Sequence, residues 1–235
     1  MSKTTLALAL VAVGGVLFAG RVEAGAPTPS VAVGTPPAPD SEEAKEDLAV
    51  VLWEQRVRTA AQVLRAAAEV KLDFADFAEA LGLAFDPSRY PLTQDLLKRV
   101  WKDSRPAVRD LQERFARPRP FIANPQVKPA VEADEGFSFP SGHATRGVLF
   151  AEILSLLAPE RRSALFACGL RIGYGRVLVG MHYPSDVLAG QRLGGLLAEI
   201  WLGDPNNLSA LENVRGREWP ATPALPITSS AATPH

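Results

Sequence analysis

Apolar residues recur every three or four positions through most of the chain from residue 48 to residue 202. This is the spacing of one face of an α-helix, whereas a half-buried strand would alternate apolar and polar residues. We find no alternating segment of any length. The sequence therefore predicts an all-α fold, a single-domain helical bundle whose core of roughly 150 residues can bury a hydrophobic interior.

The expected helices are separated by prolines and turn residues. The pattern predicts helices over residues 48–70, 73–83, 93–115, 142–157, 159–179 and 185–202. Thr93 is a suitable N-cap for the helix over 93–115, and Pro106 is expected to interrupt that helix. Residues 117–141 contain five prolines and predict a long irregular loop. Long ordered loops in compact domains are usually functional, so we expect the active site at helix ends beside this loop.

The N-terminal segment has the features of a signal peptide. Lys3 supplies a positive charge, residues 4–19 are apolar, and Val22 and Ala24 place small residues at the −3 and −1 positions of a cleavage site. We expect cleavage after Ala24 and a periplasmic or secreted protein, and the alternative is an uncleaved membrane anchor. No later segment reaches about 18 uninterrupted apolar residues, so we expect no integral membrane span after cleavage.

Composition divides the rest of the chain into three parts. Residues 25–43 are rich in proline and alanine and predict a disordered spacer. Residues 44–204 form the expected helical domain, and residues 205–235 form a C-terminal extension that ends in a loose tail. His235 is the last residue of that tail, and we assign it no role.

Charge and cysteine content exclude several kinds of function. The formal net charge is −1, so nothing predicts a nucleic-acid partner, which would need a basic face. The single cysteine, Cys168, lies in an apolar run and is expected to be a small core residue without a disulfide. No Cys/His spacing typical of a metal site is present, so no metal is expected.

Two segments carry residues suited to binding an anion. Arg117 and Arg119 alternate with prolines on a stiff backbone, and a guanidinium matches the geometry of phosphate oxygens. Ser141, Gly142 and His143 precede an apolar helical run, so they lie at a helix N-terminus, where free N–H groups bind anions. Taken singly, each segment also fits a structural role: solvated arginines in one case, and a Ser cap with a surface histidine in the other.

A third segment joins Arg176 to His182, Ser185 and Asp186. Ser185 is a good N-cap, and Asp186 suits a first helical turn, which would account for both residues without chemistry. The functional interpretation is that Asp186 accepts a hydrogen bond from His182. Such a bond fixes the imidazole tautomer and raises the basicity of the other ring nitrogen.

The order of these segments resembles a known signature. Arg119-Pro120, then the sequence PSGH at 140–143, then Arg176 with His182 six residues later and Asp186 four after that, is similar to the pattern of the phosphatidic acid phosphatase type 2 superfamily. That superfamily includes bacterial class A non-specific acid phosphatases, lipid phosphate phosphatases and vanadium haloperoxidases. The resemblance covers about residues 90–200, and the class A acid phosphatases are the most similar members.

The resemblance implies a phosphatase that uses no metal and no cofactor, acts on a phosphorylated small molecule and forms a homo-oligomer. A histidine nucleophile splits one difficult displacement into two easier steps. Fixed cations stabilise charge on the transferred phosphoryl group. By position, the resemblance implies His182 as nucleophile, Asp186 as its orienting group, His143 as general acid, and Arg119, Arg176, Ser141 and Gly142 as the phosphate cradle.

Two positions depart from the family pattern. A lysine is expected seven residues before Arg119, where this chain has Gln112, and a serine is expected before Arg176, where it has Gly175. Gln112 can donate a hydrogen bond to phosphate but carries no charge, and a charge-assisted bond is worth roughly 1.5–3 kcal/mol. We therefore expect a slower enzyme or an altered substrate range, unless another cation takes the place. The candidates are Lys102, Arg114, Arg117 and Lys128.

Several functions compete at this stage. The first is a secreted phosphatase that hydrolyses phosphate monoesters through a covalent phosphohistidine. A peripheral lipid-phosphate phosphatase is the second, and a vanadate-dependent haloperoxidase is disfavoured because Gln112 weakens anion retention. A non-catalytic phosphate-binding relative is the alternative from another class. Pure binding needs neither a nucleophile nor an acid, so His143 and His182 favour catalysis.

Overall fold

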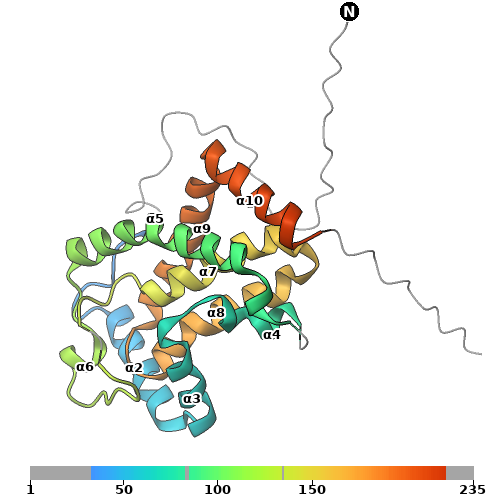
Figure 1. Cartoon of the computed structure of the whole chain (residues 1–235). Helices are drawn as coiled ribbons and strands as arrows, with labels where there is room; N and C mark the ends of the chain where they lie inside the picture. The colour runs from blue at the N-terminus through green and yellow to red at the C-terminus, as the bar shows by residue number, and fades with distance from the viewer. Residues whose placement is uncertain (1–32, 83–84, 134, 221–235) are drawn as a thin grey trace, which may run out of the picture.

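The computed structural model of the protein describes residues 33–82, 85–133 and 135–220 (Figure 1). Within these ranges the chain forms helices and no strand, which confirms the all-α prediction. The expected signal peptide and the tail beyond residue 220 lie outside the described residues. The α-helices are α2 (Glu42–Val57), α3 (Ala60–Ala68), α4 (Ala78–Leu81), α5 (Pro91–Phe115), α6 (Pro120–Ala123), α7 (Gly142–Leu157), α8 (Arg162–Leu178), α9 (Pro184–Leu202) and α10 (Pro205–Glu218), and the 3-10 turns are η1 (Glu69–Lys71), η2 (Phe74–Phe77), η3 (Pro87–Arg89) and η4 (Pro159–Arg161).

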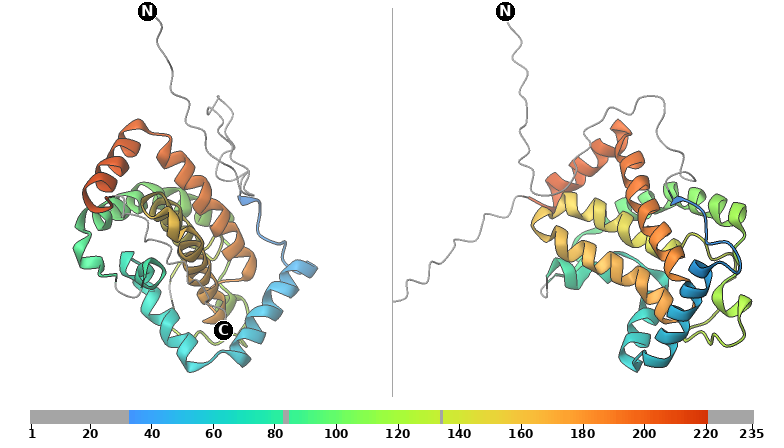
Figure 2. Two further views of the ribbon diagram at one scale, coloured as in Figure 1. Left: turned by 90° about the vertical axis from the view of Figure 1, so that its right-hand side faces the viewer. Right: turned by 180° about the vertical axis from the view of Figure 1, so that it is seen from behind.

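Helix α7 is the centre of the bundle. It packs along both α8 and α9, and α5 lies across it (Figures 1 and 2). Helices α2 and α3 cover the C-terminal end of α8. Its sequence is apolar on almost every side, which is the pattern of a buried helix. Leu149, Ile153 and Leu154 are fully buried in the main core cluster.

Glycines bring α8 and α9 close to α7. A Cβ atom on Gly147 of α7 would lie 2.6 Å from the Gly169 carbonyl oxygen of α8, a distance that real Cβ atoms do not adopt. On α9, a Cβ atom on Gly190 would clash with the Ser141 carbonyl oxygen and lie 3.0 Å from the Ala144 Cβ. The close approach of α9 to the first turn of α7 therefore depends on a residue without a side chain.

The C-terminal extension forms helix α10, which binds the start of α5. The Glu218 carboxylate of α10 accepts hydrogen bonds from the backbone N–H groups of Leu92 (2.7 Å) and Thr93 (2.8 Å). The Thr93 hydroxyl donates to the same carboxylate and accepts from the Trp219 indole N–H. The prediction that Thr93 caps α5 was wrong, because the helix begins two residues earlier, Tyr90 is the N-cap and Glu218 binds the free N–H groups.

The helix predicted over residues 48–70 is two helices. Arg58 has an extended ψ of 135°, and Thr59 starts α3 with a capping box in which Gln62 accepts from the Thr59 N–H at 2.8 Å. Helix α2 also begins at Glu42, inside the expected spacer, and Val33 is already buried in the core. The short helix expected over 73–83 consists of the 3-10 turn η2 followed by a single turn, α4.

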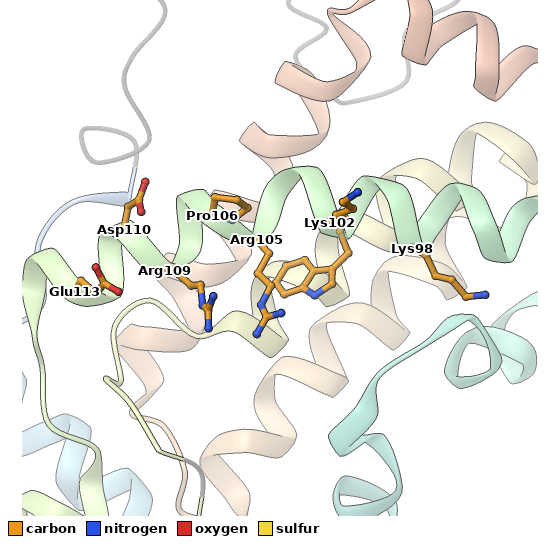
Figure 3. A pocket seen from close by; sticks show the side chains of 8 residues that line it. Lys98, Lys102, Arg105, Pro106, Arg109, Asp110 and Glu113 are labelled. Carbon is orange, nitrogen blue, oxygen red and sulfur yellow. The ribbon is translucent and has the colours of Figure 1, made fainter.

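Pro106 does not interrupt α5, so that prediction was wrong. The helix is continuous from Pro91 to Phe115 with Pro106 inside it. Pro106 lies on the exposed face of α5, at the edge of a surface groove (Figure 3). A carbonyl group left without its helical partner on that face can bind water instead, so the missing N–H costs less there than on a buried face. Among the helices of the described ranges, none is both long enough and apolar enough to cross a bilayer.

Candidate active site

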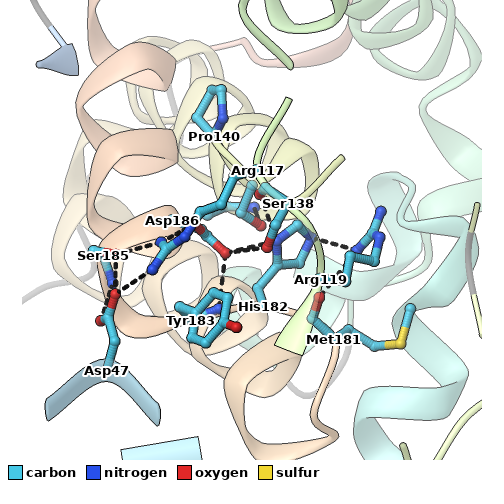
Figure 4. Close-up of polar contacts among 12 residues, drawn as sticks. Asp47, Arg117, Arg119, Ser138, Pro140, Met181, His182, Tyr183, Ser185 and Asp186 are labelled. Atoms are coloured by element: carbon cyan, nitrogen blue, oxygen red, sulfur yellow. Dashed lines mark hydrogen bonds and ion pairs between the residues drawn. The ribbon is translucent and has the colours of Figure 1, made fainter. Parts of the chain in front are cut away.

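The three sequence motifs converge at one end of the α7, α8 and α9 layer. Ser138 donates its backbone N–H to the Arg117 carbonyl at 2.8 Å, which joins the first motif to the loop before α7. Ser141 donates its backbone N–H to the Asp186 carbonyl at 2.9 Å, which joins α7 to the start of α9. The side chains of Arg117, Arg119, His182 and Asp186 then face one another (Figure 4).

His182 lies at the centre of this cluster and is 2% exposed. Its Nδ1 is 2.8 Å from the carbonyl oxygen of Ser138. Because a carbonyl can only accept, Nδ1 must carry the proton, and Nε2 then carries no proton and has a lone pair. Nε2 lies 3.0 Å from the Nη1 of Arg119, which donates to it. The backbone therefore fixes the tautomer in which Nε2 is unprotonated and accepts a hydrogen bond from Arg119.

Asp186 stands behind His182 and is completely buried. Its Oδ2 is 3.5 Å from the His182 Nδ1, and the Ser138 carbonyl is the nearer hydrogen-bond acceptor for that nitrogen. Asp186 accepts hydrogen bonds from the Ser138 hydroxyl and from the Tyr183 N–H at 2.8 Å. Burial alone would raise the pKa of Asp186, but the contacts with His182, Arg117 and Ser138 outweigh it and hold the pKa below its ordinary value.

An ion network that the sequence did not indicate extends from Asp186 to α2. Arg117 Nη1 is 2.5 Å from Asp186 Oδ1, and Arg117 Nη2 is 2.9 Å from Asp47 Oδ2. The Arg117 guanidinium also lies 4.0 Å above the Tyr183 ring. Asp47 in turn accepts hydrogen bonds from the N–H of Ser185, at 3.0 Å, and from its hydroxyl. Asp47 lies among other acidic residues of the first turns of α2, so its spacing gave no signal.

Arg119 and Arg176 place two buried guanidinium groups beside His182. Arg119 donates to the Met181 carbonyl at 3.1 Å and to the Gly136 carbonyl at 3.2 Å. Arg176 donates to the Ala66 carbonyl at 3.2 Å. Burial is the main reason that the pKa of His182 is lowered, and these two cations lower it further. The surroundings of His182 therefore favour an anion and a neutral imidazole.

Ser141, Gly142 and His143 form the start of α7, as predicted. Ser141 is the N-cap, and its hydroxyl oxygen accepts from the Ala144 N–H at 3.4 Å. His143 Nε2 lies 2.9 Å from the Val70 carbonyl, so it carries a proton and donates to that oxygen. Burial, followed by the charge of Arg176, lowers the pKa of His143 to about 3. His143 is therefore neutral at ordinary pH in the protein without substrate.

Comparison with known proteins agrees with this arrangement. The family model of the PAP2 superfamily matches residues 90–208, about half of the chain. The chain belongs to the PAP2 superfamily. The match includes all three motifs and the α10 start, and it leaves Asp47 outside.

Individual relatives of this PAP2 protein align with a quarter to about half of it. A lipid A 1-phosphatase of Rhizobium etli is 52% identical over 58 residues, which are 25% of each chain. A non-specific acid phosphatase of Salmonella typhimurium is 32% identical over 125 residues, which are 51% of this chain and 50% of the relative. The chain thus spans half or less of the length of these relatives.

A solved structure shares the fold. It is the transmembrane PAP2 type phosphatidylglycerolphosphate phosphatase from Bacillus subtilis, which aligns with a TM-score of 0.50 and 22% sequence identity. The alignment covers 68% of this chain and 85% of the other. At this identity the likeness supports the helical architecture of the PAP2 protein and nothing finer.

Gln112, at the position where the family pattern has lysine, contacts the loop before α7. Gln112 donates from Nε2 to the Pro140 carbonyl at 3.0 Å, so it ties α5 to the segment that precedes Ser141. Of the cations considered as replacements, Arg117 is bound by Asp47 and Asp186, and Arg114 lies over the Phe115 ring. Lys102 lines the groove on the outer face of α5.

Gly175 of this PAP2 protein has room for a larger residue. A Cβ atom there would meet the Ala66 Cβ at 3.5 Å, which is ordinary contact. Packing therefore does not require glycine at the position where the family pattern has serine.

In the described ranges no group of three His, Cys, Asp or Glu side chains could hold a metal ion.

Proposed function

We propose that this protein is a phosphatase that hydrolyses phosphate monoesters through a covalent phosphohistidine at His182. One observation carries the proposal: the Ser138 carbonyl fixes the proton on Nδ1, which leaves the lone pair of Nε2 beside Arg119. A neutral imidazole held in one tautomer is a competent nucleophile toward phosphorus. The family and its acid phosphatase relatives support the same reaction class.

The first chemical step transfers the phosphoryl group to the enzyme. Nε2 of His182 attacks phosphorus while the bond from phosphorus to the ester oxygen breaks. Arg119, Arg176 and the free N–H groups at the start of α7 stabilise the charge on the three remaining oxygens. His143 gives a proton to the departing oxygen, which leaves as an alcohol.

The second step releases the phosphate. Water attacks the phosphorus of phosphohistidine, its proton passes to His143, and the bond to Nε2 breaks to give inorganic phosphate. His143 is neutral in the free protein, with a pKa of about 3. A substrate phosphate bound beside it raises that pKa, since an adjacent anion favours the charged imidazole. Substrate binding therefore supplies the protonated His143 that the first step needs.

The experiment that tests this function measures p-nitrophenyl phosphate hydrolysis with EDTA present. The buried guanidinium groups supply positive charge at the phosphoryl group, so we expect activity to survive EDTA and to be lost in His182→Ala. His235→Ala is the matched control and is expected to keep full activity. Acid-labile phosphate trapped on His182 after rapid quenching is the direct evidence for the intermediate. Activity that survives His182→Ala contradicts the assignment.

A second candidate is a peripheral lipid-phosphate phosphatase that uses the same site. The 52% identity to a lipid A 1-phosphatase over 58 residues favours it. Hydrolysis of phosphatidic acid in detergent, compared with p-nitrophenyl phosphate, separates the two substrate classes. The periplasmic or secreted location is part of our proposal and rests on the signal peptide features of residues 1–24. Cleavage after Ala24 is checked by mass spectrometry of the exported protein.

A further inference from the structure

A basic groove lies on the outer face of α5, outside the catalytic cluster. It has a volume of about 480 Å³ (Figure 3). Two carboxylates, Asp110 and Glu113, line the end of the groove that is nearest to the C-terminus of α5. Four cations line the rest of it: Lys98, Lys102, Arg105 and Arg109.

Three of the four groove cations form no ion pair with the described residues. Lys98 pairs with Asp95 at 3.1 Å, in an exposed contact. Lys102, Arg105 and Arg109 have no carboxylate oxygen within 4.0 Å among the described residues. The groove therefore attracts anions, and its arginines keep their hydrogen-bond donors available.

A further cation, Arg146 of α7, contacts the same part of α5. Its guanidinium lies 5.3 Å from the centre of the Trp101 ring, which lines the groove, and 5.0 Å from that of Phe150. The Nε of Arg146 is buried and has no hydrogen-bond partner within the described part of the chain. Burial lowers the pKa of Arg146, the nearby Asp73 and Asp76 carboxylates oppose this shift, and repulsion from Arg105 adds to it. An anion beside Arg105 would relieve that repulsion.

Residues of α7 and α5 connect the groove to the candidate active site. Arg146 follows His143 by three residues on α7, and its charge contributes to the lowered pKa of that imidazole. On α5, Arg105, Arg109 and Gln112 have the i, i+4, i+7 spacing of one helix face. Gln112 contacts the Pro140 carbonyl, next to Ser141. At 1.5 Å per residue, Arg109 and Arg105 lie roughly 5 and 10 Å along the helix from the Gln112 position.

We propose that this groove binds a second phosphate group of the substrate while the first reacts at His182. The proposal rests on the proposed function and names its substrate class, which is a bisphosphorylated molecule. Roughly 5–10 Å along α5 separate the groove arginines from Gln112, so a spacer should join the two phosphates. A diphosphate, whose two groups share one oxygen, is too short to use both places. Charge on Arg105 and Arg109 thus compensates in binding for the uncharged Gln112.

The test compares hexanediol bisphosphate with hexanediol monophosphate at physiological salt, where long-range steering is screened within about 8 Å. After correction for the two equivalent reactive groups, we expect kcat/KM about ten-fold higher for the bisphosphate, the effect of one charge-assisted contact. The Arg105→Ala, Arg109→Ala double variant should lose this preference and keep its rate on the monophosphate. The control double variant, Arg192→Ala with Arg215→Ala, removes two exposed arginines elsewhere and should keep the preference.

Two kinetic results overturn the inference: equal kcat/KM for both compounds in the unaltered protein, or a preference that survives loss of Arg105 and Arg109. Binding measured by calorimetry on His182→Ala gives a readout that needs no turnover. There we expect about ten-fold tighter binding of the bisphosphate, and equal affinities contradict the groove site. Failure of the proposed function is a separate outcome, since it leaves p-nitrophenyl phosphate unhydrolysed whatever the affinities are.

Discussion

Replacing Asp47 with alanine tests the network that links α2 to Asp186 and His182. The substitution removes the ion pair with Arg117 at 2.9 Å and two hydrogen bonds from Ser185. Asp47 is 7% exposed, so solvent does little to replace these contacts. Breaking a buried ion pair typically costs about 3–5 kcal/mol. Arg117 keeps its bond to Asp186, so we expect a loss of about 3 kcal/mol in the free energy of unfolding.

Urea unfolding followed by circular dichroism measures this loss. Glu46→Ala is the matched control, because Glu46 is the exposed neighbour of Asp47 and its removal should change stability by less than about 0.5 kcal/mol. Asp47→Asn keeps the shape and one acceptor oxygen, and it should fall between the two. A loss below about 1 kcal/mol in Asp47→Ala would refute the reasoning, because the buried pair would then contribute no more than a surface pair.

Catalysis should respond as well, because Arg117 holds both Asp47 and the Asp186 carboxylate. In Asp47→Ala we expect kcat on p-nitrophenyl phosphate to fall about ten-fold, which corresponds to 1.4 kcal/mol of lost positioning. KM should change little, since Asp47 does not touch the phosphate cradle. Loss of stability with unchanged kcat would show that Asp186 keeps its place without α2.

Three further predictions concern packing, pH and charge. Gly190→Ala should lower stability by about 1–3 kcal/mol and reduce activity, because its Cβ would clash with the Ser141 carbonyl, whereas Gly195→Ala meets nothing within 4 Å and should be neutral or stabilising in thermal unfolding. His143 has a pKa of about 3 in the folded protein, below its ordinary value of about 6.5, so the unfolded chain binds more protons between these values. Stability should therefore fall as pH falls from about 6.5 to about 3, and His143→Gln should flatten this slope in urea titrations at several pH values. Gln112→Lys should raise kcat/KM on p-nitrophenyl phosphate about ten-fold, and an unchanged rate would mean that another cation already acts there.

The sequence predicted the helical bundle and the motif residues because both depend on local patterns. A helix is visible in a sequence because its apolar side chains repeat every three or four residues. Helix α7 begins at Gly142, where this repeat predicted a helix to start. The error at Pro106 arose because the cost of a missing N–H depends on which face of the helix meets water. The error at Thr93 arose because its partner, Glu218, lies 125 residues away. Such partners are set by tertiary packing, which one sequence does not reveal.

The same limit applies at the candidate active site. The sequence placed Asp186 beside His182, but the nearest acceptor for Nδ1 is a backbone carbonyl, that of Ser138. Backbone atoms carry no sequence signal, so the residue that fixes the tautomer was missed. Asp47 was missed for a different reason, since it belongs to a helix outside the family match and contacts the site only through Arg117.

On the proposed mechanism, these contacts also keep His182 and His143 unreactive until a substrate binds. Without substrate, Arg119 donates to the lone pair of His182 Nε2, and His143 is neutral, so neither the nucleophile nor the acid is ready. A bound phosphate competes for the guanidinium of Arg119, which frees Nε2, and its negative charge raises the pKa of His143. One event therefore prepares both histidines. A second phosphate in the α5 groove would add negative charge near Arg146, whose own charge lowers the pKa of His143, and would favour the protonated acid in the same way.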